Sequence, residues 1–337
     1  MAYYSLLDFQ NEPFSNTPDP RLFYHSCQHL EILQKLEISI RLKRGLSLVM
    51  GDVGTGKTTL SRQLIRKIQE DETVDHHLIL DPGFDSARDF LAHLNQLFTG
   101  QAPENSKNET QLKERIKNHL FARSVDEGTN TVLLIDEGQK ASLPILEALR
   151  ELLNFETNDE KLLQIIIFAQ NEFAHLLEGF ENFKDRINFQ YSLASLDFKE
   201  SKGLIQYRLN QSFAPGKART LFTEPAYWAI HNYTKGSPRK TINLCHQVIL
   251  AMIIRKKKKA GFFLVQSCKK KRAVADASKT ASQARRFALG GLIITALVLG
   301  FYARLNHGPQ MKIFGAMPET MALLVEQKVP EKVSYLN

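Results

Sequence analysis

The fold is decided by the stretch Gly51-Asp52-Val53-Gly54-Thr55-Gly56-Lys57-Thr58. An apolar run at residues 46–50 precedes it and predicts a buried strand, and residues 57–70 follow it with a helical pattern. A glycine-rich turn between a strand and a helix matches a phosphate-binding loop, because glycine lets backbone N–H groups approach a phosphate at a helix N-terminus. The pattern alone leaves open a glycine-rich turn with an incidental lysine.

The residue types of this loop point to a nucleoside triphosphate with Mg2+. Lys57 is expected to reach the β- and γ-phosphates as a positive charge, and the Thr58 hydroxyl to ligate the magnesium ion. The candidate nucleotide-binding residues are those of the loop and the start of the helix, Gly51, Asp52, Val53, Gly54, Thr55, Gly56, Lys57, Thr58 and Thr59.

A second motif, Leu133-Leu134-Ile135-Asp136-Glu137, supplies the candidate catalytic groups. Asp136 follows a hydrophobic strand, where a carboxylate without a cation is unfavourable, so we expect it to bind magnesium. Glu137 is expected to orient or polarise the attacking water, which favours hydrolysis over kinase chemistry. No Asn-Lys-x-Asp sequence occurs in the chain, which argues against guanine and for ATP. The alternative is a surface turn with two acids after a core strand.

Short apolar runs alternate with helical patterns along most of the chain. Strands are expected at 46–50, 77–80, 131–135 and 162–169, and helices at 28–44, 57–70, 85–98, 108–122 and 144–155. Such alternation predicts an α/β fold, a P-loop NTPase with a parallel sheet between helices. Helical patterns dominate from residue 195, so a small all-helical lid domain is expected.

These patterns predict six segments. They are an N-terminal arm and helix (1–45), an α/β nucleotide-binding domain (46–194), a helical lid domain (195–254), a basic linker (255–286), a C-terminal transmembrane helix (287–303) and a short extracytoplasmic tail (304–337). Three prolines among aromatic residues predict that residues 11–24 form an ordered, extended arm.

Residues 287–303 carry no charge over 17 residues. A helix of this length spans about 25 Å, at the short end of what crosses a bilayer, and a buried core helix is the alternative. Much of the net charge of +8 falls at 255–286, before this segment. The positive-inside rule therefore places the ATPase in the cytoplasm and the C-terminus outside. We expect a single-pass protein of the bacterial inner membrane, whose basic linker contacts anionic lipid or remains a solvated tether.

Four further polar residues are candidates at the same site. Gln170 and Asn171 follow the strand expected at 162–169 and are placed to sense the γ-phosphate, or they are solubilising strand-end residues. Arg186 lies in a charged turn and is a candidate to contact the γ-phosphate of a neighbouring subunit. Arg239 begins a helix of the lid and is expected to contact phosphate from that side. An exposed arginine in a charged turn is the alternative for Arg186.

Several motifs together resemble the general secretion pathway protein A family, AAA+ ATPases associated with type II secretion and pilus biogenesis. The motifs stand in the family's order over residues 1–255 and are Pro13-Phe14, Thr17-Pro18-Asp19-Pro20-Arg21, Tyr24, His29, Asp136-Glu137-Gly138-Gln139, Ala169-Gln170-Asn171-Glu172, Asp185-Arg186-Ile187 and Gly236-Ser237-Pro238-Arg239. The resemblance implies sensor 1 for Gln170, the arginine finger for Arg186 and sensor 2 for Arg239.

The chain departs from the family pattern at two positions. Gly138 stands where the family has alanine, and Asn171 where it has proline. Relatives often continue into a peptidoglycan-binding module, and the 34 residues after the expected membrane segment are too few for one. Cell-wall binding is therefore not expected.

The sequence is compatible with three functions. The first is a homo-oligomeric, membrane-anchored AAA+ ATPase that acts on envelope secretion or pilus assembly proteins. The second is a nucleic-acid-handling AAA+ ATPase of the transposition-regulator or loader type, which the basic cluster motivates. The third is a nucleotide-binding scaffold without useful hydrolysis, which the intact Asp136 and Glu137 disfavour.

Overall fold

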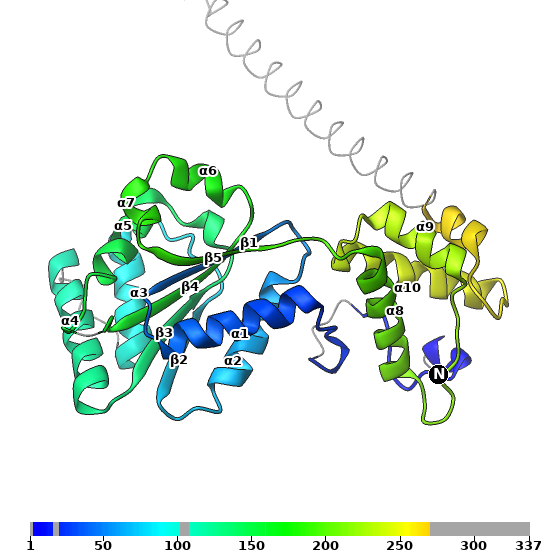
Figure 1. The fold of residues 1–337 in the computed structure, drawn as a ribbon, viewed down its shortest axis with the longest axis horizontal. Coiled ribbons are helices and arrows are strands. Elements are labelled where there is room, and N and C mark those ends of the chain that lie inside the picture. The colour runs from blue at the N-terminus through cyan, green and yellow to red at the C-terminus, as the bar shows by residue number, and fades with distance from the viewer. Residues whose placement is uncertain (1–2, 16–19, 102–107, 159, 270–337) are drawn as a thin grey trace, which may run out of the picture. The chain divides into compact units, whose positions relative to one another are not determined.

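The computed structural model describes residues 3–15, 20–101, 108–158 and 160–269 (Figure 1). The chain divides into two units, Met1–Lys271 and Arg272–Asn337, and every described residue belongs to the first. The first unit contains an α/β domain and a helical domain.

Five parallel strands form one sheet in the order β2-β3-β4-β1-β5. They are β1 (Leu46–Gly51), β2 (Val74–Ile79), β3 (Asn130–Ile135), β4 (Leu163–Ala169) and β5 (Ile187–Leu193). Every residue of β1, β3 and β4 is buried, as expected for strands covered on both faces. Because the strands are parallel, their carboxyl ends share one edge, and the glycine-rich loop, Asp136 and Gln170 all follow strands there. The predicted α/β fold is confirmed.

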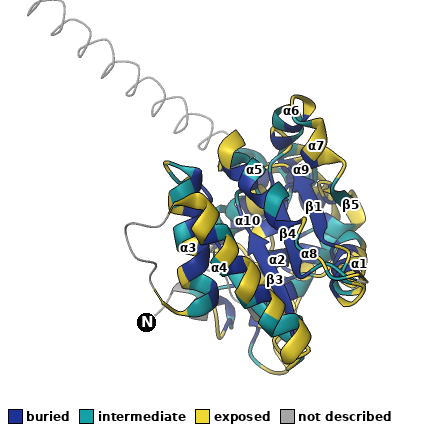
Figure 2. Ribbon diagram, turned by 90° about the vertical axis from the view of Figure 1, so that its left-hand side faces the viewer, coloured by how far each residue is buried: buried dark blue, intermediate teal, exposed yellow. Residues whose placement is uncertain are grey.

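Helices cover both faces of the sheet (Figure 1; Figure 2). One layer contains α1 (Cys27–Arg41) and α2 (Lys57–Ile68). The other layer contains α3 (Ala87–Thr99), α4 (Glu109–Phe121), α5 (Leu143–Leu152), α6 (Phe173–Glu178) and α7 (Glu181–Lys184). Successive strand residues point to opposite faces, so Val49 packs with the first layer and Leu48 with the second.

The sheet has one strand more than the sequence predicted. In β5, half-buried residues alternate with exposed ones, because this strand lies at an edge and pairs only with β1. An edge strand needs no continuous apolar run, and that run was the only feature used to predict strands. For the same reason β2, at the opposite edge, begins at Val74, three residues before the apolar part that was predicted as a strand.

The helical domain comprises α8 (Phe198–Ser212), α9 (Glu224–Thr234), α10 (Pro238–Ile254) and a helical stretch at 262–269. The linker expected from residue 255 is wrong for its first part. Ala260, Leu264 and Cys268 are buried in the core of this domain. The run of lysines at 256–259 concealed this, because a charged turn between two apolar segments reads as a linker. Residues 270–286 lie outside the described residues.

The expected segment 1–45 is also divided between the two domains. Helix α1 packs on the sheet, whereas the residues before it pack on the helical domain. The Phe9 ring stacks on Phe213 with centroids 4.5 Å apart, and Gln10 N–H donates to the Ser212 carbonyl at 2.8 Å. Arg208, buried in α8, donates to the Ser15 carbonyl at 3.2 Å. Residues before α1 thus pack against the last turns of α8 and the residue that follows it.

Among the helices of residues 3–269 that the structure describes, none is long and apolar enough to cross a membrane. The expected transmembrane segment 287–303 and the tail 304–337 lie outside the described residues.

Candidate nucleotide-binding site

The glycine-rich loop connects β1 to α2 with a backbone that only glycine adopts easily. Gly54 has φ +84° and Gly56 has φ +111°, both left-handed. Gly56 is also the N-cap of α2 and has no side chain to occupy the first amides of the helix. These amides and the helix dipole form an anion-binding geometry.

Lys57 is buried beneath this loop. Its Nζ donates to the Gly51 carbonyl at 2.7 Å and to the Asp52 carbonyl at 2.9 Å. Burial lowers the pKa of Lys57, while the carboxylates of Glu137 and Asp136 act in the opposite direction. An anion at the loop would stabilise the charged amine further. The loop carbonyls thus position Lys57, which is predicted to bind the same phosphates as the loop.

The two predicted acids follow β3 in different environments. Asp136 is 3% exposed, and its Oδ1 accepts from the Glu137 N–H at 2.9 Å. Glu137 has φ +54°, an unusual backbone for a residue with a side chain, and this turn directs it toward the loop side of the sheet edge. The buried acid is suited to hold a cation, and the strained one to act on a ligand.

Two glutamines hold the Glu137 carboxylate. Its Oε2 accepts from Gln139 Nε2 at 2.5 Å and from Gln170 Nε2 at 3.2 Å. The Gln170 backbone N–H in turn donates to Gln139 Oε1 at 2.9 Å, which closes a three-residue network between β3 and β4. Gln170 was a candidate from sequence, whereas Gln139 entered only through the family motif and had no assigned role.

Gly138 departs from the family pattern for a steric reason. A Cβ at this position would lie 2.4 Å from Ile167 Cγ2 and 3.3 Å from Ala169 Cβ. The residue is part of a short 3-10 turn, Gly138–Lys140, that packs directly on β4. Ile167 therefore occupies the space that an alanine methyl would need. At the other departure, Asn171 Nδ2 donates to Asp52 Oδ1 at 2.6 Å and so links the end of β4 to the loop.

A cavity of about 400 Å3 opens at this edge, within the range of small-molecule sites. It is lined by four groups of residues: the loop and α2, the segment around α1, the residues that follow β3 and β4, and the helical domain with the segment that leads into it. The lining residues are Ser15, Leu22, Phe23, Tyr24, His29, Val53, Gly54, Thr55, Gly56, Lys57, Thr58, Thr59, Arg62, Glu137, Gln170, Leu196, Leu204, Arg208, Pro238, Arg239 and Ile242. The lining combines glycines, charged groups and hydroxyls with aromatic and aliphatic side chains, which suits a ligand that carries both phosphates and an aromatic base.

His29 of α1 supports the loop from below. It is 3% exposed, and its Nδ1 lies 2.6 Å from Ser26 Oγ. A Cβ on Gly56 would lie 2.9 Å from His29 Nε2, so the ring occupies the space under the loop. Burial lowers the pKa of His29 to about 4, and the ring is therefore neutral at physiological pH. The sequence assigned His29 no role beyond its place in the family motif, because sequence spacing does not show which element a helical histidine faces.

The structure places the two candidate arginines differently. Arg239, at the start of α10, lines the cavity, and its backbone N–H lies 3.3 Å from the Gly54 carbonyl. Arg186 is not among the lining residues. It precedes β5, whose first residue pairs with Leu46 at the amino end of β1. Arg186 therefore lies at the amino ends of the strands, whereas the loop follows the carboxyl end of β1. Of the two candidate arginines, Arg239 lines the cavity together with the loop and Arg186 does not.

The residues present fit a nucleotide with a divalent cation. The cavity combines an open helix N-terminus with glycine at positions where a Cβ would meet Arg239 or His29. Thr58 lines the cavity, and Asp136 is a buried carboxylate next to the lining residue Glu137. A hydroxyl and a carboxylate are hard oxygen ligands of the kind that Mg2+ takes together with phosphate oxygens.

The sequence comparisons agree with this geometry. A family described as an AAA domain matches residues 40–177. General secretion pathway protein A of Aeromonas hydrophila is 31% identical over 256 residues, which are 75% of this chain and 45% of that protein. The chain is an AAA-domain relative of general secretion pathway protein A. The resemblance found in the motifs is confirmed, and the chain spans less than half the length of this relative.

Solved structures show the same fold at low identity. The chain superimposes on Drosophila ORC bound to DNA with a TM-score of 0.59 and 18% identity, covering 79% of this chain and 65% of that one. CDC6P from Pyrobaculum aerophilum gives 0.57 and 15%, covering 73% and 67%. The Aeropyrum pernix ORC2 protein gives 0.56 and 14%, covering 77% and 71%. These similarities establish the P-loop NTPase fold alone.

Proposed function

We propose that this relative of general secretion pathway protein A is an ATPase anchored in the bacterial inner membrane, which couples ATP hydrolysis to the assembly or operation of an envelope secretion or pilus complex. The observation that carries the proposal is the Glu137 carboxylate, held by Gln139 and Gln170 and facing the same cavity as the phosphate loop. A positioned acid beside a phosphate site is what hydrolysis requires and what a simple binding site does not.

Each residue has a separate part in this mechanism. The loop amides and Lys57 would bind the β- and γ-phosphates, and Arg239 would contact phosphate from the lid. Thr58 and Asp136 would hold Mg2+, which supplies charge neutralisation at the phosphates when bound. Glu137 would polarise the attacking water. The two glutamines would keep the Glu137 carboxylate oriented to accept a proton from that water.

Arg186 is assigned to a neighbouring subunit's site. Its place at the amino ends of the strands, opposite the chain's own loop, supports an action across an interface between copies. A guanidinium supplied in this way would stabilise the charge that develops during phosphoryl transfer. The proposal therefore includes a homo-oligomer in which each site is shared by two chains.

The envelope role is supported by the name of the relative and by the segment at 287–303. The relative is a general secretion pathway protein, and the uncharged segment follows a strongly basic stretch, which favours an ATPase on the cytoplasmic side. The secretion or pilus proteins on which the oligomer acts are then expected at the same membrane.

Phosphate release by the full chain tests the catalytic assignment. Glu137→Gln is expected to keep ATP affinity and to lower kcat by at least roughly 100-fold, because the general base is removed. Glu114→Gln, at an exposed position of α4, is the matched control and should retain full activity. Normal turnover by Glu137→Gln would reject the proposed role.

Mixing two inactive variants tests the shared site. Glu137→Gln and Arg186→Ala should each be slow alone, but their mixture should recover part of the activity. In mixed oligomers some interfaces pair an intact Glu137 with an intact Arg186. Co-assembly without any recovery would contradict the assignment of Arg186.

A nucleic-acid-handling role is the second candidate. The Drosophila structure with the same fold is bound to DNA, and residues 225–275 contain basic residues but no aspartate or glutamate. This role predicts DNA-stimulated ATP hydrolysis that weakens steeply with salt. DNA-independent turnover by membrane-fractionated protein would favour the first proposal.

A further inference from the structure

The helical domain carries an exposed surface that combines lysines with large apolar side chains. We call it the basic-aromatic face and define it as Trp228, residues 254–259, Phe262 and Phe263. Ile254 is 80% exposed, Phe263 is 85% exposed and Trp228 is 54% exposed. Exposed large apolar side chains mark interaction sites when they cluster.

The backbone holds this face in a defined position. After α10 ends at Ile254, the Lys257 N–H donates to the Met252 carbonyl at 2.9 Å and Lys256 adopts a left-handed φ of +51°. Ala260 is then fixed by backbone hydrogen bonds, from its N–H to Leu221 O at 2.7 Å and from Thr223 N–H to its own carbonyl at 3.0 Å. The lysines therefore project from a turn that is fixed at both ends.

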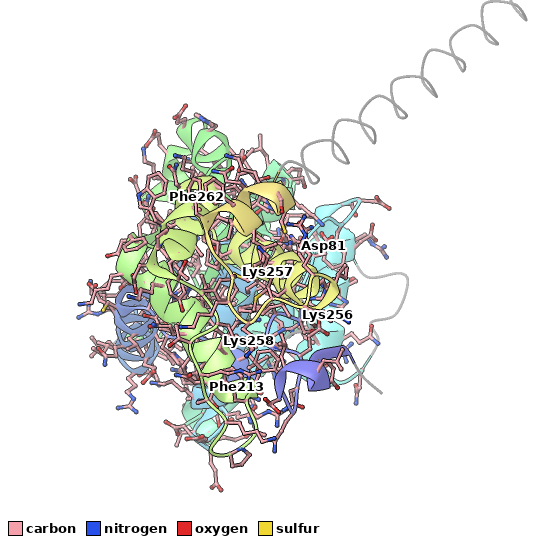
Figure 3. All side chains as sticks on the ribbon, turned by 90° about the vertical axis from the view of Figure 1, so that its right-hand side faces the viewer. Asp81, Phe213, Lys256, Lys257, Lys258 and Phe262 are labelled. Carbon is pink, nitrogen blue, oxygen red and sulfur yellow. The ribbon has the colours of Figure 1, made fainter. Side chains whose placement is uncertain are left out.

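Phe262 and Phe263 follow the lysines closely in the chain. Phe262 stacks on Trp228 with ring centroids 6.3 Å apart, and its ring contacts that of Phe263 at 5.6 Å. Figure 3 shows Lys256, Lys257, Lys258 and Phe262 on one side of the helical domain. Lys259 and Phe263 are four residues apart, so their α-carbons are at most about 14 Å from each other.

The charge of this face is not neutralised within the chain. Residues 254–259 are all exposed, and none of the five basic side chains among them forms an ion pair with a carboxylate in the part of the chain that the structure describes. No aspartate or glutamate occurs at all between residues 225 and 275. The face thus offers positive charge to an external anionic partner.

We propose that the basic-aromatic face docks onto the anionic phospholipid surface of a membrane. Lysines would contact the headgroups, while Ile254, Phe263 and Trp228 would enter the interface with the acyl region. The aliphatic Ile254 favours lipid over nucleic acid, since it offers no ring on which a base can stack. This inference rests on the membrane anchoring in the proposed function, because the segment at 287–303 would hold the face close to a bilayer at high effective concentration.

The chain contains a built-in probe, because Trp228 is its single tryptophan. The full chain is reconstituted in phosphatidylcholine vesicles with or without about 30% phosphatidylglycerol, which sets the negative surface potential. In anionic vesicles Trp228 emission should shift to shorter wavelength and be quenched at least about twofold by brominated acyl chains, because the indole enters the interface. About 0.5 M NaCl should reverse much of the effect, because screening weakens the attraction to the headgroups.

A matched pair of variants separates local docking from overall charge. Lys256→Glu with Lys258→Glu should reduce the quenching to its level in neutral vesicles. Arg66→Glu with Lys117→Glu changes the net charge equally at exposed positions of α2 and α4 and should leave the quenching intact. Phe263→Ser, at a site too exposed to affect folding, should reduce the emission shift. Equal emission in anionic and neutral vesicles, or equal loss in both charge variants, would overturn the proposal.

Two controls keep this test independent of the proposed function. An alkaline carbonate wash that releases the protein from membranes would reject anchoring, while the Trp228 response to added anionic vesicles would still decide on the face. Loss of ATP turnover with an intact Trp228 response would reject the ATPase role alone. Quenching by a single-stranded oligonucleotide without a response to anionic lipid would assign the face to nucleic acid and overturn the proposal.

Discussion

The two ends of α10 face opposite kinds of surroundings. At its start, the Arg239 N–H lies 3.3 Å from the Gly54 carbonyl, and the helix closes on the phosphate loop. At its end, Ile254 and the lysines after it project into solvent. The helix contains 17 residues, so about 25 Å separates the two ends. One helix thus packs closely on the loop at its beginning and presents exposed apolar and basic side chains at its end.

The largest effect is expected at the cavity itself. Lys57→Ala should weaken ATP binding by about 100-fold, because a buried charged contact to phosphate is removed. Lys240→Ala, one residue after Arg239 on the exposed side of α10, is the control and should bind ATP normally. Titration with a fluorescent ATP analogue measures both. Equal affinities would show that the start of α10 closes on something other than a nucleotide site.

The fit between loop and lid is tested by Gly54→Ala. A Cβ there would lie 2.8 Å from Arg239 Cβ, at a φ of +84° that disfavours alanine. We expect a loss of about 3 kcal/mol in the free energy of unfolding, from backbone strain and the displaced helix together. Gly100→Ala has a similar φ of +70° with nothing within 4 Å, so it should lose only about 1 kcal/mol. Equal losses of unfolding free energy in the two variants, measured by urea denaturation, would show that the contact between Gly54 and Arg239 adds no stability.

His29 predicts how the stability depends on pH. Its pKa is lowered by burial from 6.5 to about 4 in the folded protein, so as pH falls below 6.5 only the unfolded chain takes up the proton. The contribution is therefore complete above pH 6.5 and is lost toward pH 4, with about 2 kcal/mol gone near pH 5. Chemical denaturation at pH 6.5 and at pH 5 should show this loss of unfolding free energy in the native protein but not in His29→Gln. An equal pH dependence of the two proteins would contradict the buried, neutral histidine.

Gln139→Ala sharpens the division between binding and chemistry. Without this donor the Glu137 carboxylate keeps only Gln170, so kcat should fall about tenfold while KM for ATP changes little. Steady-state phosphate release gives both constants. A rise in KM at constant kcat would instead place Gln139 in nucleotide binding.

The smallest effect is expected at the far end of α10. Ile254→Ser should change the free energy of unfolding by less than about 0.5 kcal/mol, because the side chain is already exposed. Ile249→Ala in the same helix removes a side chain that is 2% exposed and should lose roughly 2–5 kcal/mol. A comparable loss in both variants, measured by chemical denaturation, would show that the basic-aromatic face is part of the fold rather than a surface for a partner.

The sequence singled out the glycine-rich loop, Glu137 and Gln170 because each lies in a short local motif, and the structure places all three in the lining of one cavity. The phosphate loop, Asp136 with Glu137, and Gln170 each follow a buried strand, and parallel strands bring their carboxyl ends to one edge. Edge strand β5 was missed, because its alternating pattern carries no apolar run. The contribution of Phe23, His29 and Arg208 to the cavity was not predicted, because these residues come from distant segments and no spacing rule places them together.

The sequence by itself determined the glycine-rich loop and the acids that follow β3, since local motifs of glycine, lysine and carboxylate fix both conformation and charge. Only the tertiary structure decided what surrounds these groups: a neutral histidine under Gly56, a lid helix against Gly54, and a turn of lysines supported by a buried Ala260. The physical reason is that close packing between segments far apart in the chain depends on shapes that become complementary only when the whole domain has folded.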